Sequence, residues 1–516
     1  MDKILEIIST LHIGDGNTVQ IYGIAHLLII HKKEFRELDN LLVDIILENK
    51  INLITNPTIK CIVEGKNINN YYISHYYNFS LNLLCYEGLR KIIKISDYRK
   101  DEIILTLKDL ENFLIFEKDL LDNDEKKTIG FELVVGKYIS NVRGFKDKKF
   151  IEKYINLRNQ RLKNFSPIIV FSPEGISGIT NQIKAFIIVK KIIKKTDNPR
   201  NYLFCSPQTT VQYIKILEKK FPGSVKKLIT YIKERRGLPP KFNAEFFDLF
   251  WCLEILDTAG LIDDNVKNKV VSAIEDSEAF HKNIPGCYNE DKGFSITKYF
   301  PLYDLDTTSV AIKALHSIGY MRDKYISFNF SYYKNINNNL YFTYKNDNRI
   351  SITVLAHALH AQIMLNKVDE NLVAYLNNRI KSSDYTDKFH TSILYTIYCL
   401  INAYSDYVKI NNTHNDMLEK LVSDLLNAKK DNGLFGAIEG INGTIEETAW
   451  AIISLYKYWS TFKKAYVKDI IISSQNTIKS CTFIIEDLEK EWIIKDIYNP
   501  HKINTILIQS AMNICI

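Results

Sequence analysis

The sequence has no closely spaced cysteines and no long apolar run. Its eight cysteines are scattered along 516 residues without a C-x-x-C pair. Zinc sites and redox sites usually need such spacing, so we predict neither. No uninterrupted apolar stretch approaches the ~20 residues that span a bilayer. Because Met1–Ile8 is amphipathic and acidic, unlike a secretory leader, we expect a reduced, cytoplasmic protein without a membrane-spanning segment.

Positive charge is not concentrated in one region. The net charge of +7 comes from scattered lysines. The densest basic run, Lys190–Lys195, alternates two lysines, two isoleucines and two lysines, which is typical of the solvated face of an amphipathic helix. No recognition motif for nucleic acid accompanies this run. We therefore expect no nucleic-acid partner.

Alternation of apolar and polar residues with a period of two is scarce, whereas helical periodicity is common. Apolar residues recur at i, i+3, i+4 and i+7 in several segments, and short breaks rich in Asn, Asp and Gly separate them. Helices of similar length joined by short turns favour an all-α fold, and the chain is long enough for two domains. The clearest segments are Phe246–Leu261, Ser309–Ile318, Ile350–Leu365 and Thr448–Trp459.

An acid pair precedes one of these helices. Asp304 and Asp306 are followed by Thr307, Thr308 and an apolar run. Acids in this position commonly cap a helix. The helix dipole can also keep one carboxylate charged while its neighbour holds a proton, and this asymmetry suits a general acid. The residues alone leave both roles open.

The flanks of this pair add a resemblance. Residues 294–320 resemble the acid motif of class II terpene cyclases, which is D-x-D-D followed by T-A and L-x-x-x-G-Y. Here the fourth position is Thr307, and the D-x-D-T-T variant occurs in bacterial cyclases of the tuberculosinyl (halimadienyl) and drimenyl diphosphate synthase type. As a whole the chain resembles bacterial diterpene cyclases of the tuberculosinyl (halimadienyl), copalyl or drimenyl diphosphate synthase group. Further elements of that family are matched in the same order by Thr128–Leu133 (G-F-E-[IL]), Cys205–Thr210 (S-P-S-A-T), Asp387–Ser392 (D-K-W-H-x-S) and Gly443–Ala451 (S-T-x-E-E-T-A-[YW]-A).

The resemblance implies two (α/α) helical barrels, the βγ architecture. Residues 1–19 with 246–516 would form the catalytic barrel, and 20–245 an inserted second barrel. The break Gly237–Pro240 marks the second boundary. Two D-x-G turns followed by an aromatic residue, Asp291–Phe294 and Asp431–Phe435, indicate an internal repeat. They look like decayed copies of the family's Q-x-x-D-G-x-W repeats.

The resemblance also assigns catalytic residues. Asp306 matches the family's proton donor, and Asp304 would polarise it. Thr353 and His357, four residues apart and so on one helix face, match the segment that orients the acid. His360 lies off that face and ranks below His357. Candidates for binding the substrate are the matched-segment residues Tyr303, Thr307, Lys388, Phe389, Tyr395 and Trp450, of which the aromatic ones would stabilise cationic carbons.

The implied reaction is the protonation-initiated cyclisation of a linear prenyl diphosphate. The metal-binding motifs of class I terpene synthases are missing, so the diphosphate should be retained. It would be bound by basic residues, for which Lys137 and Arg143 are candidates, with one hydrated Mg²⁺ whose protein ligands the sequence does not identify. Geranylgeranyl diphosphate is the expected substrate and farnesyl diphosphate the alternative.

Three other classes of helical protein are alternatives to this assignment. A protein prenyltransferase β subunit has a similar barrel but needs an Asp/Cys/His zinc set. A squalene cyclase would have an apolar membrane-inserting segment. A helical-repeat binding protein without catalysis is a more remote alternative. The protein could also form a homodimer, which the sequence does not decide.

Overall fold

The computed structural model shows an all-α protein with a few short strands, which confirms the predicted fold class. None of the helices in the described part of the chain is long and apolar enough to cross a bilayer. The structure describes residues 16–18, 20–30, 33–55, 58–63, 66–72, 75–122, 128–163, 241–242, 244–280, 288–297, 303–335, 339–345, 347, 349–390, 392–411, 416–437, 443–481, 498–499 and 501–516, with isolated positions between 222 and 230. Met1–Ile8, Lys190–Lys195, Cys205–Thr210 and Gly237–Pro240, which the sequence analysis used, lie outside these residues.

Contacts divide the chain into two compact units. The first unit comprises Met1–Asp15, Ala244–Lys495 and Pro500–Ile516, and the second comprises Gly16–Asn243 with Asp496–Asn499. The assignment of catalysis to the first and of an inserted role to the second stays a prediction.

The second unit contains two kinds of element. A three-stranded sheet has the order β4-β1-β7, and β2 and β3 form an antiparallel pair. Helices α2, α4 and α6 pack on one another in turn, with α3 against α4 and α5, and α7 against α6. The elements are β1 (Gly16–Thr18), α2 (Gln20–Ile30), η1 (Lys33–Leu38), α3 (Asp39–Thr55), β2 (Thr58–Val63), β3 (Lys66–Tyr72), α4 (His75–Ile92), α5 (Lys100–Asp122), α6 (Ile129–Tyr138), η2 (Ile139–Asn141), α7 (Lys148–Lys163), β4 (Lys241–Phe242) and β7 (Tyr498–Asn499).

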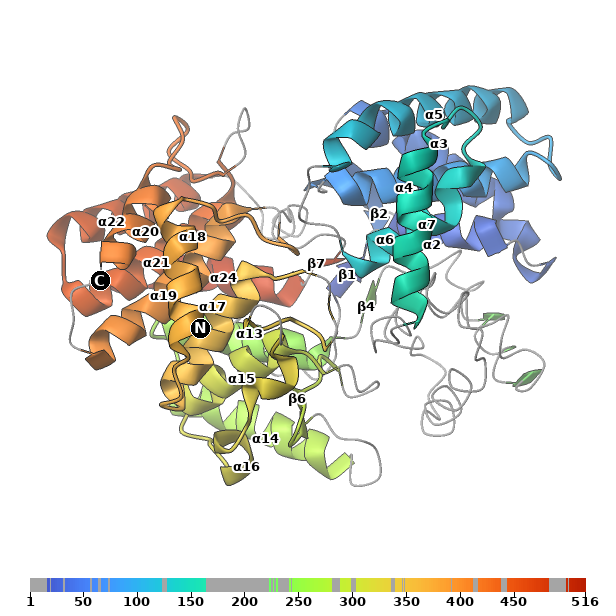
Figure 1. The fold of residues 1–516 in the computed structure, drawn as a ribbon. Helices are drawn as coiled ribbons and strands as arrows, with labels where there is room; N and C mark the ends of the chain where they lie inside the picture. Colours follow the sequence, from blue (N-terminus) through green and yellow to red (C-terminus); the bar gives the residue numbers. More distant parts are fainter. Residues whose placement is uncertain are drawn as a thin grey trace. The chain divides into compact units, whose positions relative to one another are not determined.

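The first unit is a helical barrel. Its long helices alternate along the chain between an inner and an outer layer, as Figure 1 shows. Its elements are α13 (Glu245–Thr258), α14 (Asp264–Phe280), β5 (Tyr288–Asn289), β6 (Gly293–Phe294), α15 (Leu305–Ser317), α16 (Asp323–Ile326), η4 (Phe330–Tyr333), α17 (Ile352–Met364), α18 (Glu370–Lys381), α19 (Ile393–Asn411), α20 (Asp416–Leu426), α21 (Ile445–Phe462), α22 (Ala465–Ser480) and α24 (His501–Asn513).

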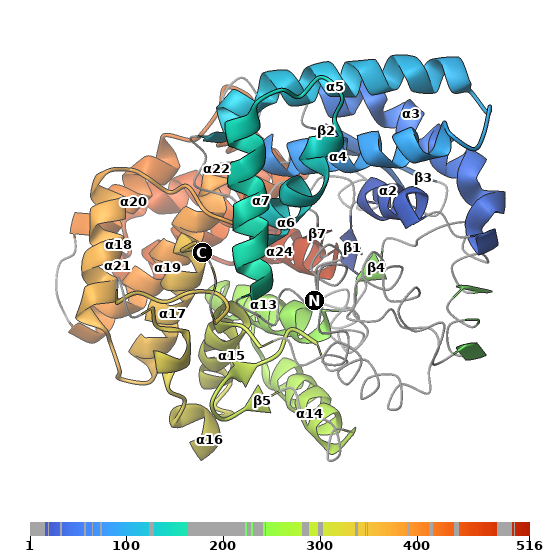
Figure 2. The same ribbon diagram turned by 45° about the vertical axis from the view of Figure 1, so that its right-hand side comes forward.

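The inner helices form a closed ring. Helix α13 packs on α15, α15 on α17, α17 on α19, α19 on α21, α21 on α24, and α24 packs back on α13. Helices α18, α20 and α22 pack against the outside of this ring, and Figure 2 shows α18 and α20 outside α17 and α19. The inner helices are buried almost all round, which is why their segments are apolar on more than one face.

The helices α15, α17, α19 and α21 of the ring run in the same direction. Near their N-termini, Asp306 of α15 contacts His357 of α17, and Ser392 before α19 contacts Glu447 of α21. Farther along the same helices, Asp406 of α19 pairs with Lys457 of α21. Side chains from the first turns of these helices therefore meet at one end of the barrel.

In each copy of the predicted repeat, hydrogen bonds fix where an inner helix begins. The amide of Phe294 donates to Thr308 Oγ1 at 2.9 Å, and this hydroxyl donates to the Asp304 carbonyl at 2.6 Å. The amide of Phe435 donates to Thr448 Oγ1 at 2.9 Å, and that hydroxyl donates to the Thr444 carbonyl at 2.6 Å. Each D-x-G turn thus fixes the first turn of the helix that follows it.

Glycine is required in the first of these turns. Gly293 has φ +78°, and a Cβ atom there would lie 2.2 Å from Thr308 Oγ1. Gly319 has a similar φ of +73°, but a Cβ atom there would meet nothing within 4 Å. Comparing substitutions at the two glycines therefore distinguishes the cost of a positive φ from the cost of a steric clash.

We predict that Gly293→Ala destabilises the protein more than Gly319→Ala. Both changes cost about 1–2 kcal/mol for a left-handed alanine, and only Gly293→Ala adds a clash worth about 1–3 kcal/mol. Thermal unfolding of the two variants measures the difference. Equal melting temperatures would show that Thr308 moves aside freely and that the turn does not fix α15.

Candidate active site

Asp304 caps the helix α15. Its carboxylate Oδ1 accepts a hydrogen bond from the Thr307 amide at 2.7 Å, and its backbone is extended, as an N-cap requires. The side chain is buried, so the helix dipole acts on this carboxylate with little screening by water. Of the two roles that the sequence left open, the capping role therefore belongs to Asp304, and Asp306 stays the candidate for the acid.

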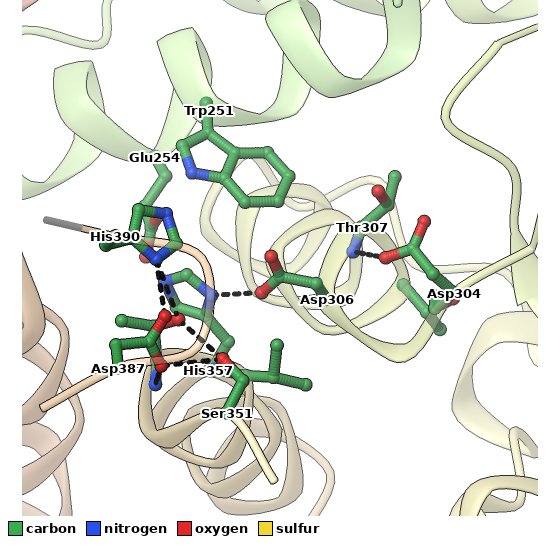
Figure 3. A network of polar contacts seen from close by, with 12 residues as sticks. Trp251, Glu254, Asp304, Asp306, Thr307, Ser351, His357, Asp387 and His390 are labelled. Atoms are coloured by element: carbon green, nitrogen blue, oxygen red, sulfur yellow. Dashed lines mark hydrogen bonds and ion pairs between the residues drawn. The ribbon is translucent and has the colours of Figure 1, made fainter. Parts of the chain in front are cut away.

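Asp306 pairs with His357. Its Oδ1 lies 2.7 Å from Nδ1 of His357, a residue near the middle of α17 (Figure 3). The Asp306 side chain is 8% exposed and that of His357 is 2% exposed. No other side-chain hydrogen bond of Asp306 is found among the described residues. One carboxyl oxygen is therefore oriented by the imidazole, and the other is left for a reacting group.

The imidazole of His357 favours its protonated form. Burial alone lowers the pKa of His357, but the neighbouring Cys399 and the Asp306 carboxylate raise it by more, so that it lies well above its ordinary value. Cys399 is itself a neutral thiol, because burial raises its pKa to about 11. The Asp306 carboxylate is thus the lasting cause of the shift in the pKa of His357. The His357 Nε2 atom is buried and meets no hydrogen-bond partner in the described part of the chain.

Thr353 does not contact Asp306. Its hydroxyl lies 3.0 Å from Ser351 Oγ and 3.4 Å from His390 Nδ1, while its amide donates to Asp387. Asp387 also accepts from Ser351 Oγ at 2.7 Å and lies 2.8 Å from His390 Nδ1. Although burial opposes ionisation, the hydrogen bonds from His390 and its neighbours lower the pKa of Asp387. Thr353 therefore belongs to a second buried network, whose other members Ser351, Asp387 and His390 are drawn with the Asp306–His357 pair in Figure 3.

Aromatic rings surround the pair. Trp251 of α13 meets the His357 ring edge to face at 5.7 Å, and its Nε1 donates to Tyr395 Oη at 2.7 Å. The Tyr395 ring packs in turn on Trp450 at 4.9 Å. Because α13 and α19 are not neighbours in the ring of helices, the Trp251–Tyr395 contact crosses the barrel interior. Sequence analysis missed Trp251, which lies in no matched segment; its only signal was the four-residue spacing to Phe247, on which it stacks.

The remaining candidates make no side-chain hydrogen bond to Asp306 or His357 in the described part of the chain. The Lys388 ammonium is bonded to the buried Asp347 at 2.5 Å, so this charge is already matched inside the protein. Phe389 and Tyr303 are half-buried. Thr307 is fully buried beside Asp304, and its hydroxyl has no hydrogen-bond partner among the described residues.

His360 belongs to a different cluster. Its Nε2 lies 2.7 Å from Asp406 Oδ2, and Asp406 Oδ1 also binds Lys457 at 2.8 Å. Burial lowers the pKa of His360 by more than Asp406 raises it. The structure therefore brings His357, and not His360, to the acid.

The described residues offer no ready metal site. No group of three or more His, Cys, Asp and Glu side chains in them could hold a metal ion. In the G-F-E element, Glu132 is bonded to Arg161 at 2.6 Å. The ammonium of Lys137, in the last turn of α6, lies over the Tyr138 ring, and Arg143 is exposed. Neither the diphosphate-binding residues nor an Mg²⁺ site follows from this geometry.

Comparisons with known proteins identify the fold. No protein-family model and no curated protein matches the sequence. The structure is similar to ent-copalyl diphosphate synthase from Streptomyces platensis, with a TM-score of 0.64, 14% identity, and coverage of 99% of this chain and 98% of that one. It is also similar to ent-copalyl diphosphate synthase from Arabidopsis thaliana, in complex with (S)-15-aza-14,15-dihydrogeranylgeranyl thiolodiphosphate (TM-score 0.53, 13% identity, 92% and 77% covered). Abietadiene synthase from Abies grandis is a further neighbour (TM-score 0.51, 14% identity, 94% and 68% covered). The chain therefore has the fold of the class II terpene cyclases.

Proposed function

We propose that this protein is a class II terpene cyclase that protonates a linear prenyl diphosphate and cyclises it to a bicyclic terpenyl diphosphate. The observation that carries the proposal is the buried hydrogen bond between Asp306 and His357, 2.7 Å long, beside the Trp251 ring. The similarity in fold to two ent-copalyl diphosphate synthases supports a C20 substrate, geranylgeranyl diphosphate. Farnesyl diphosphate is the alternative that the D-x-D-T-T motif allows.

Asp306 is the proton donor in this proposal. A protonated His357 donates its Nδ1–H to Asp306 Oδ1, so that the transferable proton resides on the other carboxyl oxygen. Protonating an isolated alkene is unfavourable, and the carboxylate left behind must be stabilised in a medium of low polarity. The imidazolium supplies that stabilisation. Asp304 is held by the first turn of α15 and so does not compete with Asp306 for the imidazole.

The ring interior would stabilise the cations that follow. Faces of Trp251, Tyr395 and Trp450 are each worth about 0.5–2 kcal/mol of cation–π stabilisation. A carbocation also needs water to be excluded, and the inner helices are closely packed around these rings. The product would form when a C–H bond next to the last cationic carbon gives its proton to a base and its electron pair to a new C=C bond, so that one proton enters, one leaves and the product is an isomer of the substrate.

The diphosphate would remain on the product. Basic side chains and one hydrated Mg²⁺ would bind it, and Lys137 and Arg143 stay candidates. Because the described residues provide no donor set for the ion, Mg²⁺ is assigned no step here.

We predict that Asp306→Asn abolishes cyclisation. The amide is nearly isosteric but has no transferable proton, so a loss of at least about a hundredfold is expected. Purified protein is incubated with geranylgeranyl or farnesyl diphosphate, and the products are identified after dephosphorylation. If the wild-type protein converts neither substrate, the proposed function is contradicted. More than a tenth of wild-type turnover in the variant would remove Asp306 from the donor role.

His357→Ala should slow the chemical step about ten- to hundredfold, because a hydrogen bond to a charged group is worth roughly 1.5–3 kcal/mol. His360→Ala is the matched control on the same helix. It removes a bond to Asp406, so we expect lower stability but a single-turnover rate within about threefold of wild type. If His360→Ala has a strongly reduced single-turnover rate and His357→Ala a nearly normal one, His360 and not His357 supports the acid.

The leaving group gives a separate test. A pure class II enzyme forms a product that keeps its diphosphate, so no inorganic pyrophosphate should accompany turnover. A coupled pyrophosphate assay on a phosphatase-free preparation measures this. Stoichiometric release would point to ionisation of the diphosphate and would contradict the proposal.

A further inference from the structure

Glu254 lies in the barrel interior one turn beyond Trp251. The two residues are three positions apart on α13 and so share a helix face. Trp251 contacts His357 and Tyr395 across the ring, while Glu254 Oε1 accepts from Asn402 Nδ2 of α19 at 3.2 Å. The side chain of Glu254 is 1% exposed. This carboxylate therefore lies in the interior, next to the residues that surround the acid.

Neighbouring carboxylates form ion pairs, and Glu254 forms none among the described residues, although the Lys313 ammonium attracts it from a distance. Asp257 binds the Lys313 ammonium at 2.8 Å, and Asp406 binds Lys457 at 2.8 Å. Glu254 receives only the neutral amide of Asn402, which also donates to Thr258. Its Oε2 is buried and meets no hydrogen-bond partner in the described part of the chain. A buried oxygen left in this way costs about 1–3 kcal/mol or more, so a partner is expected.

His357 Nε2 is the matching group. It is buried and likewise meets no partner among the described residues, although its ring is the one that favours a positive charge. In the view of Figure 3, Asp306 lies to the right of His357, and Glu254 lies to its upper left, where it overlaps His390. Burial, Cys399, Asp306 and Glu254 all raise the pKa of Tyr395, in that order, which places both carboxylates around the Tyr395 ring. The thiol of Cys399 is a weak acceptor and cannot satisfy an imidazolium N–H.

We infer that Glu254 is a positioning residue for the acid: its Oε2 binds, through one buried water, the Nε2–H of protonated His357. This inference rests on the proposed function, because it concerns the base that supports Asp306. A water with two such partners is typical of buried polar gaps. The imidazolium would then be held between two carboxyl groups, one that reacts and one that does not, and would neither rotate nor lose its proton easily.

Several titratable groups face His357, and the inference depends on their separate contributions. Asp306 on α15 and Cys399 on α19 act on the pKa of His357, the Tyr395 ring packs against it, and the Asp387–His390 pair lies next to Tyr395. Glu254 on α13 acts on Tyr395 and Cys399. Because Asp387 is already bonded to His390 and Ser351, Glu254 is the carboxylate that the inference brings to the imidazolium beside Asp306. Neutralising Glu254 should therefore lower the pKa of His357.

The test is the titration of His357 in the whole protein. NMR of ¹⁵N-histidine-labelled samples monitors the titration, and the variant His357→Gln identifies the His357 signal. Glu254→Gln removes the charge but keeps the shape, and Glu254→Asp keeps the charge. Glu275→Gln, the same change at an exposed position on α14, is the matched control. We expect the His357 pKa to fall by about one unit or more in Glu254→Gln and to stay within about 0.3 units of wild type in Glu275→Gln. Glu254→Asp should recover most of the loss.

The single-turnover rate gives a second measurement. In Glu254→Gln the decline of the rate at alkaline pH should begin about one pH unit lower than in the wild type, so that the rate on this declining limb is about tenfold below wild type. An unchanged His357 titration in Glu254→Gln overturns the inference, and so does loss of the folded state in both Glu254 variants, since Glu254 would then be structural. A wild-type protein that converts no prenyl diphosphate would instead overturn the proposed function, and the titration would still decide the role of Glu254.

Discussion

The packing of α15 against α17 in a shared direction is the constraint on which the site depends. It places the first turn of α15 beside the middle of α17, so Asp306 meets His357 where water is almost excluded. Two such groups lose their hydration on folding, and their attraction repays that cost only when the geometry is well fixed. The closed ring of inner helices supplies the fixed geometry, because neither helix can shift without disturbing its next neighbour.

Several inner helices of the barrel begin with the same kind of N-cap, but they carry different residues in the first turn. Asp304, Ser351 and Thr444 are N-caps of α15, α17 and α21, each accepting a hydrogen bond from an amide of the first turn. The residues two positions after these caps are Asp306, Thr353 and Glu446, and all three are buried. The same backbone device thus carries an acid on one helix, a hydroxyl on the next and a second acid on a third. The chemistry of each is set by its neighbours rather than by the helix start.

Much of this could be predicted from the sequence because it is local. Helical periodicity indicated the inner helices, and the D-x-G turns indicated the repeat, since both depend on residues close together in the chain. The choice of His357 over His360 rested on the one-turn register of α17. The role of Thr353 could not be foreseen, because it depends on a loop that brings Asp387 and His390 to its hydroxyl. Trp251 and Glu254 were also missed, since their partners lie across the ring on α19, more than 140 residues away.

The two histidines of α17 show why the neighbours decide. Burial lowers the pKa of His360 most, and the ammonium groups of Lys313 and Lys457, the second of which also pairs with Asp406, lower it further. His357 faces Asp306 without a competing cation among the described residues, and its pKa is raised. The lysines matter as well as the acids, because Lys313 and Lys457 pair with Asp257 and Asp406 at the far end of the inner helices and neither pairs with Asp306. The acid–imidazole pair and the lysine–carboxylate pairs are thus separated along the inner helices, and the rings of Trp251 and Tyr395 pack against His357 at the end that holds the acid.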